Sequence, residues 1–176
     1  MSDPRKPDVV TVAVTRVDGG VTVLRVVTVE YGPGPNGTRI QHWAIAPTPA
    51  YVDRIIAKHD WQGPQAPVSW RFVPDDYVDE QTDRSFRNAW KDTHGQGKPD
   101  VDMDKAKAIH RDRLRAARTD LLEALDAEWM QADETNDLQA KALIRIEKQR
   151  LRDITNDPRI DAAQTTDDLK RIGVTP

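Results

Sequence analysis

The chain of 176 residues contains no cysteine, and its longest uninterrupted apolar run is four residues. The absence of cysteine excludes disulfide bonds, thiolate nucleophiles and cysteine-based zinc sites. The short apolar runs and the polar beginning MSDPRKPD predict neither a signal peptide nor a membrane-spanning helix. We therefore expect a protein without a membrane partner.

A large excess of charge of one sign is also absent, because the formal net charge is only −3. Lys and Arg number 12 against 13 Asp and Glu in residues 1–100, and 14 against 16 in residues 101–176. Neither half is therefore a basic module that binds nucleic acid through its overall charge. Hydrophobic residues make up only 38% of the chain and charged residues 31%, which is typical of an elongated or oligomeric protein. We expect a homo-oligomer.

What the N-terminal part does contain is a run of Val and Thr over residues 9–31, broken only at Asp18-Gly19-Gly20. β-Branched residues favour strands, and the Asp-Gly-Gly sequence favours a tight hairpin turn. Thr48 followed by Pro49 is a good helix start. The expected elements are strands over 9–17, 21–31, 38–45 and 68–73 and a helix over 49–59, which together predict a β-rich N-terminal unit, residues 1–73.

Residues 74–99 are interpreted as a linker, because PDDYVDEQ has no hydrophobic periodicity and THGQGKP breaks the chain again. Between these two stretches, Phe86, Ala89 and Trp90 have i, i+3, i+4 spacing after a possible cap at Thr82 or Asp83. We therefore expect a short helix that presents Phe86 and Trp90 for docking.

The C-terminal part, residues 100–176, predicts an extended helical hairpin. A helix without Gly or Pro begins after Asp100 or Asp102 and runs to about Glu134, and a second helix covers about 138–154. A short last helix is expected at about 166–172, capped near Thr165. The predicted fold class is therefore α+β: a small antiparallel β-rich unit, an extended antiparallel helical hairpin and a short C-terminal helix.

Each arm of the hairpin has an apolar stripe. On the first arm it consists of Ala106, His110, Leu114, Ala117, Leu121, Leu125, Trp129 and Ala132, and on the second arm of Leu138, Leu143, Ile146, Leu151 and Ile154. Because the second arm is shorter, residues 103–117 have no partner within the hairpin. We expect this overhang to dock on the Phe86/Trp90 helix, on the β-rich unit or on another chain.

The basic stretch AKAIHRDRLRAAR, residues 106–118, allows three interpretations. Nucleic-acid binding is one, but no aromatic residue interleaves with the cations, and residues 119–137 carry seven acids and no cation. Structural pairing is the second, since the cationic end of the second arm would lie beside that acidic stretch. An anionic protein partner is the third.

No pattern in the sequence predicts catalysis, a metal or a cofactor. Asp100, Asp102 and Asp104 resemble the start of a calcium loop, but its sixth and twelfth positions hold Lys105 and Arg111, so helix capping is the better interpretation. A nucleophile elbow and a phosphate-binding glycine motif are both absent. A histidine site assembled from distant segments stays open.

Large aromatic side chains are both core residues and interface anchors. Trp43, Trp61 and Trp70 are expected in the core of the N-terminal unit, whereas Trp90 and Trp129 are the better interface candidates. The residues predicted to bind a partner are Phe86, Trp90, His110, Leu114, Ala117 and Trp129.

Five motifs in residues 84–172 carry a family resemblance: RSFRNAWKD (84–92), VDMDKAKAIHRDRLRAAR (101–118), LDAEWMQA (125–132), KQRLRDI (148–154) and TTDDLKRI (165–172). This half resembles a family of small proteins from the tail genes of tailed bacteriophages and prophages. More distantly, it is similar to the C-terminal parts of tail-fibre assembly proteins.

The resemblance implies a non-enzymatic structural protein at the distal tail, the baseplate or the tail-fibre attachment. Its partners would be other tail or tail-fibre proteins, and it would be located in the virion tail after assembly in the cytoplasm of the bacterial host. A tail-fibre assembly chaperone that is not retained in the virion is the first alternative. A nucleic-acid-binding regulator is the second.

Overall fold

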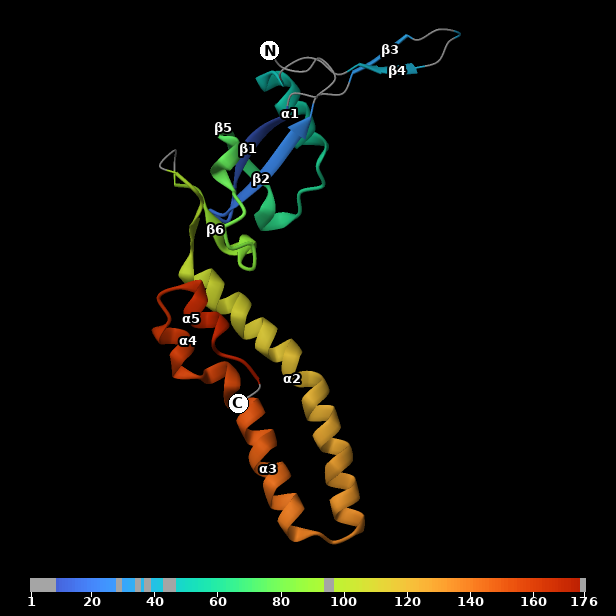
Figure 1. The fold of residues 1–176 in the computed structure, drawn as a ribbon, viewed down its shortest axis with the longest axis vertical. Helices are drawn as coiled ribbons and strands as arrows, with labels where there is room; N and C mark the ends of the chain where they lie inside the picture. The colour runs from blue at the N-terminus through green and yellow to red at the C-terminus, as the bar shows by residue number, and fades with distance from the viewer. Residues whose placement is uncertain are drawn as a thin grey trace. The chain divides into compact units, whose positions relative to one another are not determined.

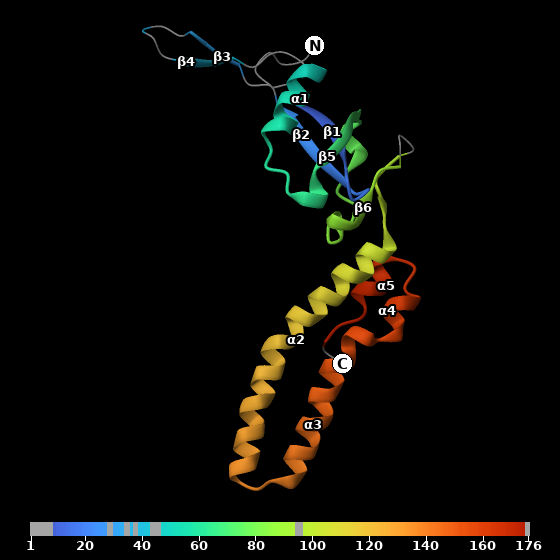
Figure 2. The same cartoon turned by 180° about the vertical axis from the view of Figure 1, so that it is seen from behind.

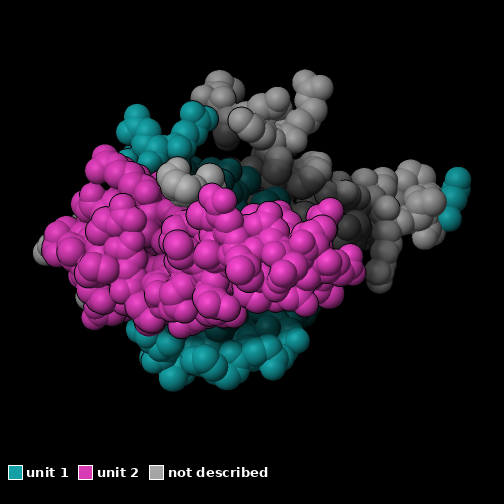
Figure 3. Space-filling model, turned by 90° about the horizontal axis from the view of Figure 1, so that it is seen from below, with its two compact units in different colours: residues 1–101 teal, residues 102–176 magenta. Residues whose placement is uncertain are grey.

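The computed structural model of the chain describes residues 9–27, 30–33, 36, 39–42, 47–93 and 97–174. Trp43 and His94 lie outside the described residues. The chain is an α+β protein, as expected, and it divides into two compact units, residues 1–101 and residues 102–176 (Figure 3).

The first unit is built on a three-stranded antiparallel sheet of β1 (Val9–Arg16), β2 (Val21–Val27) and β5 (Pro67–Val73), in the order β2-β1-β5. The predicted hairpin between β1 and β2 is confirmed. Gly19 has a φ of +73°, which favours glycine, and a Cβ on Gly20 would lie 2.0 Å from the guanidinium of Arg16, so a larger residue there would displace that side chain.

The strand expected over 21–31 is two strands in different sheets. β2 ends at Val27, and β3 (Glu30–Pro33) pairs instead with β4 (Arg39–His42) in a separate two-stranded ribbon. The third predicted strand is thus confirmed over residues 39–42.

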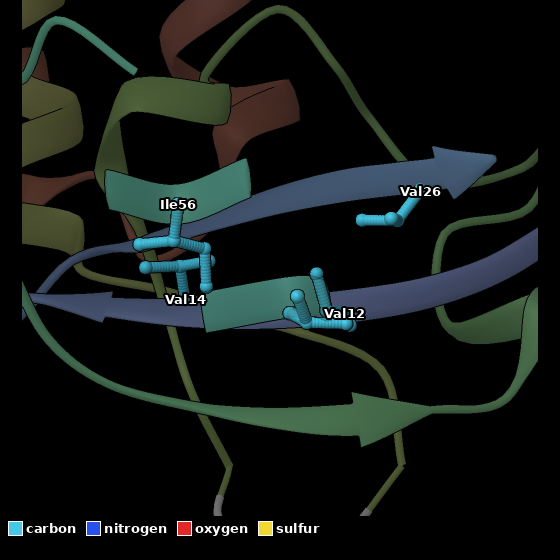
Figure 4. Packing of buried hydrophobic residues seen from close by; sticks show 5 residues of the cluster. Val12, Val14, Val26 and Ile56 are labelled. Atoms are coloured by element: carbon cyan, nitrogen blue, oxygen red, sulfur yellow. The ribbon is translucent and has the colours of Figure 1, made fainter. Parts of the chain in front are cut away.

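One face of the sheet is covered by α1 (Pro49–Lys58), which begins as predicted, with Thr48 as its cap and Pro49 in its first turn (Figure 1). A cluster of buried side chains joins the helix to the sheet: Val12, Val14, Val26, Val52 and Ile56 (Figure 4). Trp61 and Trp70 pack against this cluster, as expected for core tryptophans. Because β1 is the central strand, it is buried on both faces.

The other face of the sheet is covered by residues 74–93 and 97–101, whereas residues 74–99 were expected to form a linker. This segment contains 3₁₀ turns at Asp75–Tyr77 and Arg87–Ala89 and the short paired strands β6 (Trp90–Lys91) and β7 (Asp100–Val101). Tyr77 and Trp90 lie in a buried cluster with Ala13, Val21 and Val73.

The predicted docking helix at Phe86 and Trp90 was wrong. Asp83 accepts hydrogen bonds from the backbone of Ser85 and, through its carbonyl, from the indole of Trp90. These bonds stabilise a compact turn that directs both aromatic side chains inward. Phe86 is 1% exposed and Trp90 6% exposed, so neither is available for docking.

The second unit contains α2 (Met103–Glu134), α3 (Leu138–Asp153), α4 (Pro158–Ala162) and α5 (Thr166–Lys170). The predicted hairpin is confirmed: α2 and α3 lie side by side in both views (Figures 1 and 2). Asp102 caps α2 by accepting hydrogen bonds from the N–H groups of Asp104 and Lys105, which confirms the capping interpretation of the acidic triplet.

Candidate partner-binding surfaces

The first half of α2 is covered by the C-terminal segment of the same unit. Lys107 donates a hydrogen bond of 2.8 Å to the carbonyl of Asp161, and Arg111 forms an ion pair of 2.6 Å with the carboxylate of that residue. Arg111 also donates to the carbonyl of Thr155. Both views show α4 and α5 beside this part of α2 (Figures 1 and 2). The buried side chains of the covering segment are Ile154, Thr155, Ile160, Ala163, Leu169 and Ile172.

Residues 103–117 were expected to dock on the Phe86/Trp90 helix, on the β-rich unit or on another chain, and these three alternatives did not include the partner that the structure shows. The overhang of the hairpin is filled by residues 154–172, whose short helices the sequence predicted only in part. His110 and Leu114 are buried, so they serve the core of the unit and not an outside partner.

His110 occupies an apolar site with cations nearby. Burial lowers its pKa below the ordinary value of 6.5; a hydrogen bond with the Ile172 backbone opposes this effect, while Arg113 and Arg111 add to it. Its buried Nε2 atom makes no hydrogen bond with any described part of the chain. The neutral imidazole is therefore the form that the fold favours.

The contact stripe of α2 differs from the predicted one at Ala117 and Leu121, whereas Leu125, Trp129 and Ala132 are buried or half-buried as predicted. Ala117 and Leu121 are exposed, while Arg118 and Leu122 are half-buried. Arg118 donates hydrogen bonds to the carbonyls of Leu151 and Arg152 at the end of α3. Arg118 therefore takes the place in the stripe that was predicted for Ala117.

Opposite charges pair across the hairpin, as the structural interpretation predicted. Lys148 forms an ion pair with Asp126 at 2.5 Å, and Lys141 forms one with Asp133. Trp129 lies half-buried beneath the cationic groups of α3: Lys141, Arg145 and Lys148 are 5.4 to 6.0 Å from the centre of its ring. Trp129 therefore joins the two arms of the hairpin.

A polar cluster in the first unit joins β5 to the segment that follows it. Arg71 binds Asp92 through two hydrogen bonds of 2.6 and 3.0 Å, and the hydroxyl of Tyr77 donates to the same carboxylate at 3.0 Å. Burial and then the bond to Asp92 raise the pKa of Tyr77 to about 12. The three bonds to Asp92 therefore connect β5 with Tyr77 and with the end of the segment that follows it.

The exposed large apolar side chains are not those predicted as interface residues. In the first unit they are Val9, Val17, Val68 and Phe72, and in the second unit Leu121, Met130, Leu138, Leu143 and Ile146. The sequence predicted four of the latter, Leu121, Leu138, Leu143 and Ile146, in the apolar stripes of the hairpin. On α3 the seam is formed instead by Ile144, Lys148 and Leu151.

The hairpin also has a groove near its turn. Its volume is about 460 Å³, and its walls include Ala132 of α2 and Ala140 and Leu143 of α3. The signal that could have identified this surface is the spacing of Leu143, Ile144 and Ile146, which at about 100° per residue cannot all lie in one narrow stripe of a helix.

Within the described residues, no helix is long and apolar enough to span a bilayer, and no three His, Asp or Glu side chains lie close enough together to hold a metal ion. No protein-family model matches the chain, and no curated protein or solved structure is significantly similar to it.

Proposed function

We propose that this chain is a non-enzymatic structural protein of a bacteriophage tail, which binds other tail or tail-fibre proteins at the distal tail, the baseplate or the fibre attachment. The proposal starts from the resemblance carried by the motifs in residues 84–172. It is supported by what those motif residues do in the fold.

The observation that carries the proposal is that residues of these motifs are buried in the fold or cap a helix. RSFRNAWKD supplies the buried Phe86 and Trp90 and the carboxylate of Asp92. TTDDLKRI supplies the capping box of α5, in which Thr165 and Asp168 bind each other's backbone. The residues that carry the resemblance therefore pack in the core or cap a helix, which is compatible with a family of structural proteins.

Exposed apolar side chains supply the second support. β5 is an edge strand, and its Val68 and Phe72 are exposed beside the partly buried Trp70. Edge strands with apolar side chains are common sites of protein association. The surfaces of the chain are thus suited to protein partners.

The basic stretch offers little support for the nucleic-acid alternative. Lys107, Arg111 and Arg118 bind carbonyl or carboxylate oxygens of their own unit, and Arg115 pairs with Asp112 at 2.5 Å. Phosphates would have to replace these contacts. A direct check is to measure binding to DNA and RNA at low salt, where an electrostatic interaction is strongest.

Mass spectrometry of purified particles from the phage or induced prophage that encodes the chain tests the proposal. A structural protein is recovered in a fixed ratio to the other tail proteins. An assembly chaperone is present in the lysate but missing from the particles. If the chain is missing from the particles and deletion of its gene leaves complete, infective tails, the tail assignment is wrong.

A further inference from the structure

The last part of the second unit consists of two helices that are too short to be stable alone. α4 and α5 contain five residues each, and isolated helices shorter than about 12 residues are marginal in water. Their order therefore depends on packing against the rest of the unit. The side chains that pack are Ile160, Ala163, Leu169 and Ile172, each at most 4% exposed. We call residues 157–172 the C-terminal latch.

The polar contacts between the C-terminal latch and α2 lie at the surface. Lys107 donates to the carbonyl of Asp161, and Arg111 pairs with the carboxylate of Asp161, which is 72% exposed. An ion pair so accessible to water contributes little to stability. The docking of the latch beside α2 (Figures 1 and 2) therefore depends mainly on the buried side chains.

His110 lies in the contact between α2 and the latch. Its neighbours one turn away on the same face of α2, Ala106 and Leu114, are buried as well. The imidazole is hydrogen-bonded to the backbone of Ile172 at the end of the latch. Because this bond favours the protonated form of the ring, the imidazole donates it to the carbonyl of Ile172.

The other ring nitrogen is where a proton would be added. Nε2 of His110 is buried and makes no hydrogen bond with any part of the chain that the structure describes, so the bond to Ile172 involves Nδ1. In the neutral ring Nε2 is an acceptor, and protonation makes it a donor and adds a positive charge. A buried donor without an acceptor and a buried charge without a counter-charge both destabilise the docked state.

The charged groups around His110 do not compensate for that charge. Arg113 and Arg111, on α2 itself, are cations and oppose a positive imidazole. The carboxylates of α3, α4 and α5, and the nearest one on α2, are bonded to other groups, and the 3₁₀ turn Ile154–Asn156 has no charged residue. These pairs are Glu147–Arg150, Asp153–Gln149, Asp157–Arg159, Asp161–Arg111, Asp167–Lys170, Asp168–Arg171 and Asp112–Arg115.

We propose that the C-terminal latch is a pH-sensitive cover of α2, which is released when His110 is protonated at Nε2. Release lets water solvate the imidazolium, and it uncovers the apolar face of α2 at Ala106 and Leu114 for another protein. The seam nearer the turn of the hairpin has its own contacts, such as Lys148 with Asp126, and should remain closed. The inference goes beyond the tail assignment and does not depend on it.

The direction of the pH effect follows from the surroundings of His110. Burial and the two arginines lower its pKa in the docked state below 6.5, and release returns it toward that value. The equilibrium constant for release therefore rises as the pH falls below 6.5, by about tenfold per pH unit, until the pH reaches the pKa of the docked state. Asp and Glu ordinarily titrate near pH 4, so histidine is the side chain that changes charge between about pH 7 and pH 5.

Hydrogen exchange of the full chain at about pH 7.5 and about pH 5 tests the release. The rates are expressed as protection factors, which remove the direct effect of pH on exchange. The protection of residues 157–172 should fall several-fold at the lower pH, by up to about thirtyfold. Residues 120–134 and β1 should keep their protection.

Two variants remove the proton-binding group. His110→Gln keeps a polar side chain and His110→Leu suits the apolar site, and in each the protection of the latch should be the same at both pH values. His59→Gln is the matched control, because His59 is an exposed histidine of the first unit, and its latch should respond like that of the wild type. In the wild type itself, the loss of latch protection should follow the titration of His110 measured by nuclear magnetic resonance.

Three results would overturn the inference. The first is a wild-type latch that is equally protected at both pH values, and the second is an equal loss of protection in residues 120–134, which would mean that the whole unit opens. The third is a pH dependence that both His110 variants retain or that does not follow the titration of His110. Each result would leave the tail assignment intact, whereas a latch that opens in a chain missing from virions would reject that assignment alone.

Discussion

Leu169→Ala tests whether the C-terminal segment is the partner of the first half of α2. Leu169 lies in α5 and has no exposed surface. The substitution removes three carbons, each worth about 0.8 kcal/mol of transfer free energy, so at least about 2.4 kcal/mol is lost. The cavity left behind raises the expected loss in the free energy of unfolding to about 2.5–5 kcal/mol.

Leu143→Ala is the matched control, because it makes the same chemical change at a side chain that is 62% exposed. Leu143→Ala should lower the free energy of unfolding by at most about 1 kcal/mol, because only the buried part of the side chain contributes transfer free energy. Both variants are unfolded with urea in dilute solution, where self-association is weakest, and are followed by far-UV circular dichroism.

Hydrogen exchange then shows which of the two units has lost stability, because compact units of one chain can open separately. We expect peptides from residues 103–117 to lose protection in Leu169→Ala, while peptides from β1 keep theirs. If Leu169→Ala costs no more than Leu143→Ala, or if residues 103–117 stay protected, then the segment does not cover α2 and the reasoning fails.

Two further predictions concern pH. Because the pKa of Tyr77 is raised to about 12 by burial and Asp92, the stability that its neutral phenol contributes is complete below its ordinary pKa of 10 and is lost as the pH rises to about 12. Urea unfolding at a series of alkaline pH values should show this loss, and Tyr77→Phe should abolish it. Because burial and two arginines lower the pKa of His110, its contribution is complete above its ordinary pKa of 6.5 and falls as the solution becomes more acidic. Nuclear magnetic resonance should place its titration below 6.5, and His110→Gln should remove this part of the acid dependence of unfolding.

Much of the local structure could be predicted because its signals lie close together in the sequence. The turn at Asp18-Gly19-Gly20, the Thr48-Pro49 start of α1 and the absence of Gly and Pro from α2 each act over a few residues. Such signals depend on backbone geometry and on capping hydrogen bonds, and neither needs a distant partner.

The predictions that were wrong depended on which face of an element is covered. Phe86 and Trp90 have helical spacing, but a 3₁₀ turn follows Phe86, both side chains are buried, and Trp90 packs with residues of the sheet. On α3, Leu143 and Ile144 are equally apolar neighbours, and only the position of α2 decides which one is buried. A one-residue difference in spacing turns a side chain by about 100°, so the pattern alone could not choose between them.

The sequence by itself therefore determined the fold class, the two arms of the hairpin and the opposite charges that pair across them. Only the tertiary structure decided which apolar residues are left for a partner. It withdrew Phe86, Trp90, His110 and Leu114 into the cores of the two units, and it exposed Met130 and Ile146. The physical reason is that burial depends on contacts between segments far apart in the chain, such as Asp161 with Arg111, whose pairing no local pattern records.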